Sequence, residues 1–343
     1  MTNFVIVIDN RLSYSHLMKW ATALALALTA IVFSTPAQMN NGASTFKLAL
    51  PAHPGQLIWD ADGFKIIESS AKPKGQEIGI RGRDQSGRLT FLGFLFLAPE
   101  EAPLTSLKCQ QSAMEEAKKS NSTLKVLATS SIDNSQGQFI ALVTYTQRGA
   151  DRKTGYSVRG FVATGDICGD LEFYCDSPIS SDDADLRKIF ESYSLDPDYV
   201  PRFADTFIYA QILYQHRMFK AAAPLFEQEL KMLGDDKDQL KVRRITTDQA
   251  GMAYGISGNI PKARAIFDAA IAKDPEYPMY YYNLACADAE EKKLTDARTH
   301  LQQAFDRRAN LIPGEKFPDP TKDDSFLPYR DNKEFWAFLE TLR

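Results

Sequence analysis

The side chains that could do chemistry in this 343-residue chain are histidines, cysteines and paired acids, and their spacing fits none of the common catalytic patterns. The four histidines lie far apart and make no HExxH pattern. Paired carboxylates can act as general acid and base, but adjacent acids are usually solvated surface groups. Neither GxxxxGK[ST] nor GxGxxG occurs, so no phosphate-binding loop is indicated. The groups considered are His16, His53, His216 and His300, with the acid pairs Asp60/Asp62 and Glu115/Glu116.

We therefore expect no enzyme activity, no metal site and no cofactor. A hydrolase with an unrecognised site in the first domain is kept as the lesser alternative. The composition is that of a globular, mildly acidic protein, with 44% hydrophobic residues, 24% charged residues and a formal net charge of −4. Such a chain lacks the basic excess that neutralises phosphates, so no nucleic-acid partner is expected. At this length two domains are expected.

The N-terminal residues carry the pattern of an export signal. Lys19 precedes an apolar run over 21–33, and the small-x-small ending Thr35-Pro36-Ala37 follows it. The run is too short for a comfortable transmembrane helix, which takes about 20 residues. We expect residues 1–37 to be an upstream extension plus a cleaved signal peptide, with the true start at Met18 and the mature chain beginning near Gln38. An uncleaved anchor is the alternative. The predicted location is periplasmic or extracellular, with no stable membrane span after cleavage.

The four cysteines contain no CxxC pair, which argues against a zinc ribbon or a redox dithiol. An exported protein can form disulfides. We predict a bond between Cys109, on a helix that crosses the sheet, and Cys168, at the start of a late strand. The rival pairing joins Cys168 to Cys175, which would lie about 23 Å apart on one straight strand and would need a turn between them. Cys286 is expected to be a free packing thiol.

Residues 44–195 are predicted to form an α+β domain, an antiparallel sheet with two covering helices. Short runs rich in β-branched and aromatic residues alternate with turn sequences such as Asp84–Gly87 and Asp133–Gly137. A stretch over 104–119 has no Gly or Pro and favours a helix. The expected strands are 64–68, 77–81, 88–97, 124–130, 138–146, 156–164 and 171–175, and the expected helices are 104–119 and 182–193.

This element order resembles the PsbP-type α/β/α sandwich of photosystem extrinsic proteins. The closing residues that carry the resemblance are Phe161-Val162-Ala163-Thr164, Leu171-Glu172-Phe173 and Ser192-Tyr193-Ser194-Leu195. Because members of that family are mostly binding or assembly modules, the resemblance implies a role of that kind for this domain.

A second domain is indicated at 203–310 by a spaced set of small and aromatic residues. They follow the pattern G-x2-Y-x3-G-x4-A-x3-F-x2-A-x4-P, which resembles the tetratricopeptide (TPR) repeat family. The matching positions are Gly251, Tyr254, Gly258, Ala263, Phe267, Ala270 and Pro275. In such a hairpin, small residues let two helices approach closely while the aromatic side chains fill the seam between them.

Two further copies support three TPR hairpins. At the 34-residue period, Ala285, Ala297, Leu301 and Ala304 take the places of Gly251, Ala263, Phe267 and Ala270. An earlier, more degenerate copy carries Ala222, Phe226 and Leu230. Since one hairpin cannot bury its apolar face alone, stacking must supply the core.

The resemblance also implies a binding surface, because the first helix of each TPR hairpin lines the concave face. The eight positions transferred in this way, here called the groove residues, are Phe207, Gln211, Tyr214, Gln215, Asp248, Met252, Met279 and Tyr282. This surface lacks the Lys and Arg with which some TPR domains clamp an acidic C-terminus. We expect Tyr214, Met252 and Tyr282 to be partly exposed if the groove binds a peptide. The alternative is that several groove residues are packed under the first domain or the tail.

The remaining segments complete the prediction. A Pro-stiffened linker is expected at 196–202, and 311–343 is expected to be a loop followed by a capping helix. The covering residues of that cap are Phe335, Trp336, Phe338 and Leu339. The sequence predicts an exported scaffold that binds a protein or peptide through the TPR groove. A structural component of the cell envelope that contacts its partners through the first domain is the alternative.

Overall fold

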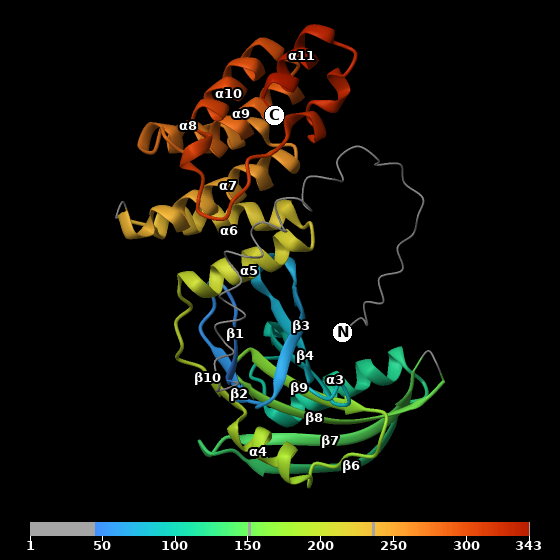
Figure 1. The fold of residues 1–343 in the computed structure, drawn as a ribbon. Coiled ribbons are helices and arrows are strands. Elements are labelled where there is room, and N and C mark those ends of the chain that lie inside the picture. Colours follow the sequence, from blue (N-terminus) through green and yellow to red (C-terminus); the bar gives the residue numbers. More distant parts are fainter. Residues whose placement is uncertain (1–44, 150–151, 235–236, 343) are drawn as a thin grey trace. The chain divides into compact units, whose positions relative to one another are not determined.

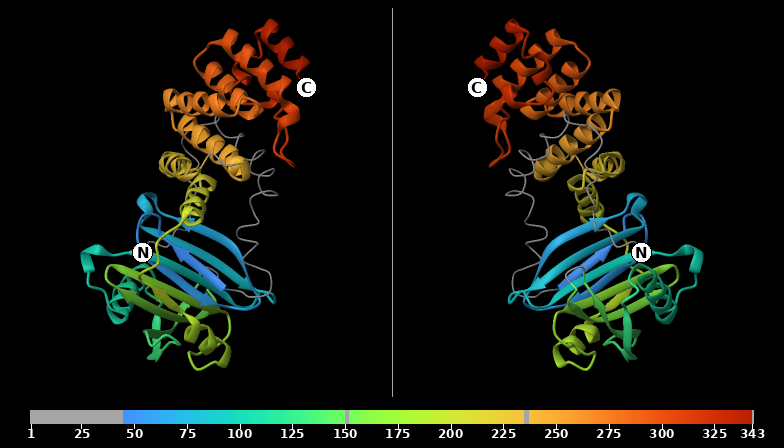
Figure 2. Two further views of the ribbon diagram at one scale, coloured as in Figure 1. Left: turned by 90° about the vertical axis from the view of Figure 1, so that its left-hand side faces the viewer. Right: turned by 90° about the vertical axis from the view of Figure 1, so that its right-hand side faces the viewer.

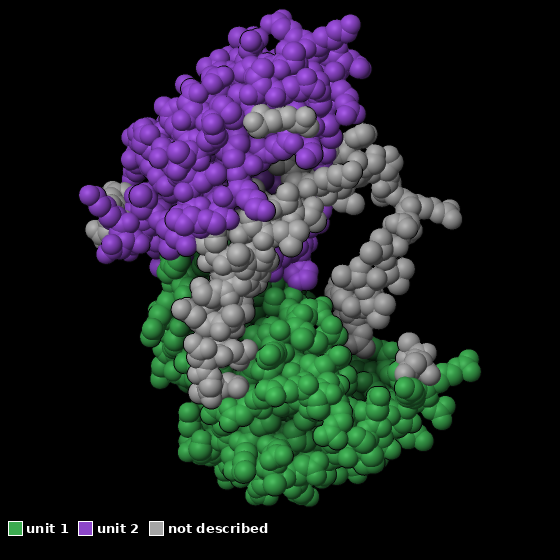
Figure 3. All heavy atoms as spheres, in the orientation of Figure 1, with its two compact units in different colours: residues 1–8, 35–212 green, residues 9–34, 213–343 purple. Residues whose placement is uncertain are grey.

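The computed structural model describes residues 45–149, 152–234 and 237–342. Within these ranges the chain divides into two compact units, 45–212 and 213–342, here called the sheet unit and the helical unit (Figure 3). No helix of the described ranges is both long enough and apolar enough to span a membrane. The predicted signal peptide and the predicted start at Met18 lie outside the described residues.

A seven-stranded antiparallel sheet forms the main body of the sheet unit (Figure 1). The strand order is β3-β4-β5-β9-β8-β7-β6. β5 therefore pairs with β9, although a helix and three strands separate them in the sequence. Figure 2 shows the twist of this sheet. Its strands are β3 (Phe64–Ala71), β4 (Glu77–Asp84), β5 (Thr90–Leu97), β6 (Lys125–Asp133), β7 (Phe139–Arg148), β8 (Thr154–Thr164) and β9 (Ile167–Cys175).

The turn between β6 and β7 shows why the chain reverses there. The Asn134 side chain accepts hydrogen bonds from the amides of Gln136 and Gln138, at 3.0 and 2.8 Å. Gly137 has a φ of +75°, a conformation that side chains other than glycine rarely adopt. The turn sequence thus fixes the register of the two strands.

A second, three-stranded antiparallel sheet was not anticipated from the sequence. It consists of β1 (Thr45–Ala49), β2 (Gln56–Asp60) and β10 (Ser194–Asp196), in the order β1-β2-β10. Trp59 of β2 packs against Phe46 and Phe91 with ring centroids 5.5 and 5.6 Å away. Gly93 makes room for Trp59, since a Cβ there would lie 2.6 Å from the indole. An aromatic core therefore lies between the two sheets.

The two predicted covering helices are present, and they pack on opposite faces of the large sheet. Helix α3 (Ser106–Ser120) covers the face that carries Val143 and Phe161. Helix α4 (Ala184–Ser192) lies on the face shared with the small sheet, where Phe190 meets Phe173 edge-on at 5.8 Å. The predicted class, an antiparallel sheet with two covering helices followed by helical hairpins, is confirmed, with the small sheet as an addition.

The predicted disulfide is also present. Cys109 of α3 is bonded to Cys168 of β9, with the two Cα atoms 6.3 Å apart. The bond ties the helix to the middle of the sheet within a buried cluster that includes Met114 and Tyr145. Cys175 and Cys286 are free and buried, so the rival pairing of Cys168 with Cys175 is wrong.

The helical unit is a stack of TPR-like hairpins (Figure 1). Gly251 of α7 faces Phe267 of α8, and a Cβ at Gly251 would lie only 2.2 Å from the ring. Ala263, Ala285 and Ala297 are likewise buried at helix contacts. Its helices are α6 (Phe219–Met232), α7 (Leu240–Ile256), α8 (Ile260–Lys273), α9 (Pro278–Glu290), α10 (Leu294–Asp306) and α11 (Lys333–Thr341), and α5 (Phe203–Gln215) contains the division between the two units.

The expected capping helix is present as α11, and the expected linker begins within the sheet unit. In α11, Phe335 and Leu339 are buried, whereas Trp336 and Phe338 are half-buried. The segment expected to link the domains is part of the sheet unit at its beginning, because Asp196 belongs to β10 and the Gly55 amide donates to the Tyr199 carbonyl at 2.8 Å. The division between the compact units falls within α5, after Ile212.

Candidate partner-binding surface

The groove residues come from the first helix of each hairpin, α5, α7 and α9, but they are not equally accessible. Gln215 is exposed, and Gln211, Tyr214 and Met252 are half-buried. The remaining four groove residues are buried: Phe207, Asp248, Met279 and Tyr282. The expectation that Tyr282 would be partly exposed is wrong, because its side chain is 0% exposed.

The burial of Tyr282 is caused by a later part of the chain. Residues 311–329, here called the tail segment, run as an irregular loop between α10 and α11 (Figure 1) and lie against α9. Phe317 and Phe326 meet the Tyr282 ring edge-on, with centroids 5.6 and 6.1 Å away. The Tyr282 hydroxyl donates to the Asp323 carboxylate at 2.8 Å. The sequence alternative in which the tail covers groove residues therefore applies to the third hairpin.

Further hydrogen bonds follow the tail segment along α9. The Tyr277 hydroxyl donates to the Glu315 carboxylate at 2.7 Å, just before the helix begins. At the far end, the Tyr329 hydroxyl donates to the Ala289 carbonyl at 2.5 Å. Ser325 also donates to Glu290, at 3.2 Å. The segment is thus held by polar contacts at both ends and by aromatic contacts between them.

Asp248 and Asp323 are buried where the tail segment meets the helices, and Glu315 is half-buried there. Burial, with repulsion from Glu315, raises the pKa of Asp248 to about 8, and the hydrogen bond from Asn283 opposes this shift. Burial also raises the pKa of Glu315 and that of Asp323. Within the described residues, none of the three forms an ion pair with Lys, Arg or His. They are held by neutral donors.

The part of the surface that the tail leaves open lies on the earlier hairpins. The Tyr214 ring packs edge-on against Phe219 and Phe226, at 5.0 and 5.9 Å, and remains half-buried. Met252 is half-buried on α7, and Gln215 is exposed at the end of α5. This open part is uncharged and includes a flexible thioether, which suits an apolar or uncharged polypeptide.

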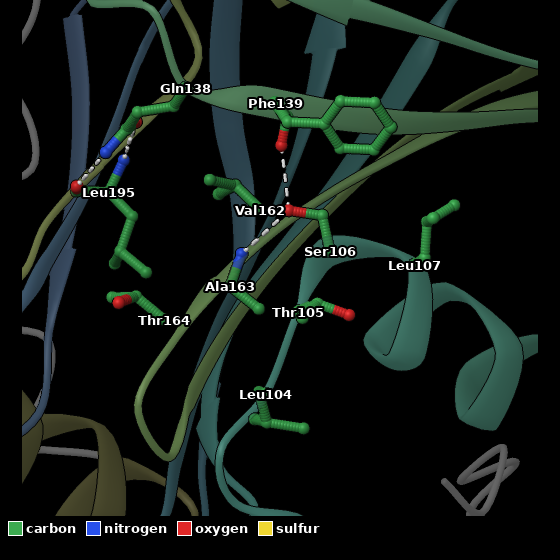
Figure 4. Close-up of a pocket in the computed structure, with 10 residues that line it drawn as sticks. All are labelled: Leu104, Thr105, Ser106, Leu107, Gln138, Phe139, Val162, Ala163, Thr164 and Leu195. Carbon is green, nitrogen blue, oxygen red and sulfur yellow. Dashed lines mark hydrogen bonds between the residues drawn. The ribbon is translucent and has the colours of Figure 1, made fainter.

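The sheet unit has a second candidate surface, an apolar pocket of about 500 Å³ at the start of α3 (Figure 4). Ser106 donates to the Phe139 carbonyl at 2.8 Å and accepts from the Ala163 amide at 3.3 Å. Because these polar groups are satisfied within the wall, the pocket offers mainly apolar contact. The residues that line it are Leu104, Thr105, Ser106, Leu107, Gln138, Phe139, Val162, Ala163, Thr164 and Leu195.

Sequence reasoning missed this pocket. Leu107 and Phe139 are 50% and 43% exposed, although both belong to types that usually lie inside. The sequence did contain one signal of an apolar surface. Leu107 lies in the first turn of α3, two residues after the N-cap Thr105, and its side chain is exposed. The pocket depends, however, on the pairing of strands far apart in the chain.

The paired acids of the sequence analysis do not gather into a metal site. Asp60 and Asp62 line an open cavity of about 1030 Å³ together with Asp84, Arg88 and Lys188. Glu115 and Glu116 lie on α3. Within the described residues, no group of three or more His, Cys, Asp or Glu side chains is arranged to hold a metal ion.

Comparison with known proteins gives likenesses among solved structures. No protein-family model and no curated protein sequence matches the chain. Among solved structures, the type III secretion translocator chaperone SycD of Yersinia enterocolitica is 16% identical, with a TM-score of 0.30, over 41% of this chain and 90% of that one. The Sgt2 TPR domain of Aspergillus fumigatus is 18% identical, with a TM-score of 0.31, over 39% and 82% of the two chains.

The sheet unit has a likeness of its own. The cyanobacterial PsbP protein CyanoP of Synechocystis sp. PCC 6803 is 10% identical, with a TM-score of 0.31, over 44% of this chain and 92% of that one.

Proposed function

We propose that this protein is an exported, non-enzymatic adaptor that binds a protein or peptide partner through the groove residues. The observation that supports this most is the tail segment. An irregular stretch of polypeptide lies on this face, with its phenylalanines against Tyr282 and its carboxylates on tyrosine hydroxyls. A face that accommodates one such segment has the chemistry to accommodate another.

The open positions indicate the chemistry of the partner. Tyr214 and Met252 offer aromatic and thioether surface, and Gln215 offers an amide that can bond to a backbone. Side chains of the first two kinds are enriched in protein interfaces. We propose an uncharged or apolar segment of a polypeptide as the ligand, rather than an acidic C-terminus.

A second candidate function is supported by the pocket at the start of α3. Its exposed rim residues, Leu107 and Phe139, make it suitable for one apolar side chain of a partner. In this alternative, the protein is a structural component of the cell envelope that makes its contacts through the sheet unit.

Co-purification from envelope extract separates the two candidates. The full chain is compared with Met252→Ala, with Leu107→Ser, and with Asp268→Ala as a control on the outer helix α8. Loss of a retained polypeptide with Met252→Ala alone supports the groove. An anchor contact of about 1 kcal/mol would lower retention roughly fivefold. Loss with Leu107→Ser alone favours the pocket, and equal retention by all four proteins contradicts both candidates.

A further inference from the structure

The tail segment has two features that a permanent part of the core normally lacks. It has no regular secondary structure beyond single turns, Pro320–Lys322 and Leu327–Tyr329. It also brings carboxylates into a buried site that already contains one. Burying an acid without a cationic partner carries a free-energy cost that grows as the group ionises.

We propose that the tail segment is a releasable internal occupant of the groove, and that its release uncovers Tyr277 and Tyr282 for a partner. The idea rests on the proposed function for the partner, but release itself is a property of the chain alone. It identifies Glu315 and Asp323 as the groups that set how readily the segment leaves.

The charged surroundings of these two groups determine the direction of the effect. Burial raises the pKa of Glu315, while the Tyr277 hydroxyl, the Ile312 amide and the charge of Arg244 act against it. Arg244 is itself paired with Asp274 through two bonds of 2.6 and 2.9 Å. Burial likewise raises the pKa of Asp323.

For Asp323, the Tyr282 hydroxyl and the Ser325 amide oppose the shift, and Asp324 and Glu290 reinforce it. On the helix side, Asp248 is the remaining acid, and it repels Glu315. Each carboxyl therefore has a higher pKa in the docked segment than it would have in solvent.

The sign of the pH dependence follows. Below the ordinary carboxyl pKa, both the docked and the released segment are protonated, so docking is at full strength. As the pH rises through the docked-state pKa values, the released segment loses its protons first and docking weakens. Each unit of difference between the two pKa values changes the docking equilibrium about tenfold.

A natural reporter lies under the segment. Cys286 is buried on α9, beside Asp323 and Ser325. In a Cys175→Ser background it is the one free thiol of the described residues, because Cys109 and Cys168 are bonded to each other. Its rate of alkylation therefore measures how often the segment opens.

The test is alkylation of full-length Cys175→Ser protein by iodoacetamide from pH 5 to pH 8.5. The protection of Cys286 is the alkylation rate of the denatured protein divided by that of the folded protein at the same pH. This ratio removes the effect of the titration of the thiol itself. We expect the resulting protection to fall tenfold or more across this range, and to be independent of urea below the unfolding transition, as in local opening.

The matched variants are Glu315→Gln/Asp323→Asn, which keeps acceptors for both tyrosines, and Asp331→Asn/Glu340→Gln, which neutralises two exposed acids nearby. The first should give a clearly smaller fall of protection with pH, because Asp248 is left to titrate at this contact. The second should follow the unmodified segment. If the first variant fails to fold, the pH and urea profiles of the Cys175→Ser protein decide. Protection that is flat with pH, or that follows global unfolding in urea, would show the tail segment to be a fixed part of the core. No partner is present, so this result is separate from the co-purification.

Discussion

Replacing Gly251 with alanine tests the physical basis of the hairpin seam. The new Cβ would lie 2.2 Å from one atom of the Phe267 ring and 2.6 Å from two others. These distances are far below the roughly 3.5–4.0 Å of a favourable carbon contact. Phe267 is only 2% exposed, and Tyr280 lies beyond it at a centroid distance of 6.4 Å, so the ring has little room to move.

Two opposing effects set the size of the change. Overpacking a core costs about 1–3 kcal/mol, and the short contact favours the upper end of that range. Alanine is better than glycine inside a helix by about 1 kcal/mol. We therefore expect Gly251→Ala to destabilise the helical unit by about 2 kcal/mol.

The same helix provides the control. At Gly255 the nearest atom to a new Cβ is the Ala263 methyl group at 3.7 Å, an ordinary contact. Gly255→Ala should therefore stabilise the protein by about 0.5–1 kcal/mol through helix preference. Urea unfolding followed by circular dichroism at a helix band measures both. A Gly251→Ala protein as stable as the unmodified chain, or equal losses for both variants, would refute the account of the seam.

Three other predictions follow from burial, the disulfide and the sequence. Tyr282→Ala should lower the free energy of unfolding, measured with heat or urea, by about 3–5 kcal/mol, because a fully buried ring is lost and Asp323 loses its hydrogen-bond donor. Met252→Ala should lower it by about 1 kcal/mol or less, and similar losses for the two variants would contradict the assigned burial. Removing the disulfide with Cys109→Ser/Cys168→Ser should destabilise the sheet unit by about 4 kcal/mol, as expected for a sequence separation of 59 residues. Cys175→Ser should change the free energy of unfolding little, and equal effects of the two changes would contradict the bond. Exported protein should begin at or near Gln38 by N-terminal sequencing, and recovery of intact Met1 in the cytoplasm would contradict export.

What the sequence predicted best was local. The positions of Gly251 and Phe267 follow a short repeat, and their contact joins neighbouring helices, so spacing alone was enough. Helix α3 was predicted from its local composition, since the stretch over 104–119 has no Gly or Pro. The Cys109–Cys168 bond was predicted from the order of the elements around it.

What the sequence did not reveal depends on pairing between distant residues. The small sheet joins Leu57 to Leu195, and its strands are too short to show a period. The tail segment also has no periodicity, so nothing in its sequence placed Phe317 or Phe326 on Tyr282. Transfer of groove positions from a repeat pattern therefore gave residues on the first helix of each hairpin without showing that the tail segment covers Tyr282.

The central claim is that a polypeptide partner binds to the open part of the groove. The most direct measurement places a photo-crosslinking amino acid at Met252, on the groove helix α7, and in a second protein at Ala269, which is exposed on the outer helix α8. After irradiation of envelope preparations, the account predicts a discrete crosslinked polypeptide from the Met252 position and none from Ala269. The same crosslinks from both positions, or none from Met252, would contradict it.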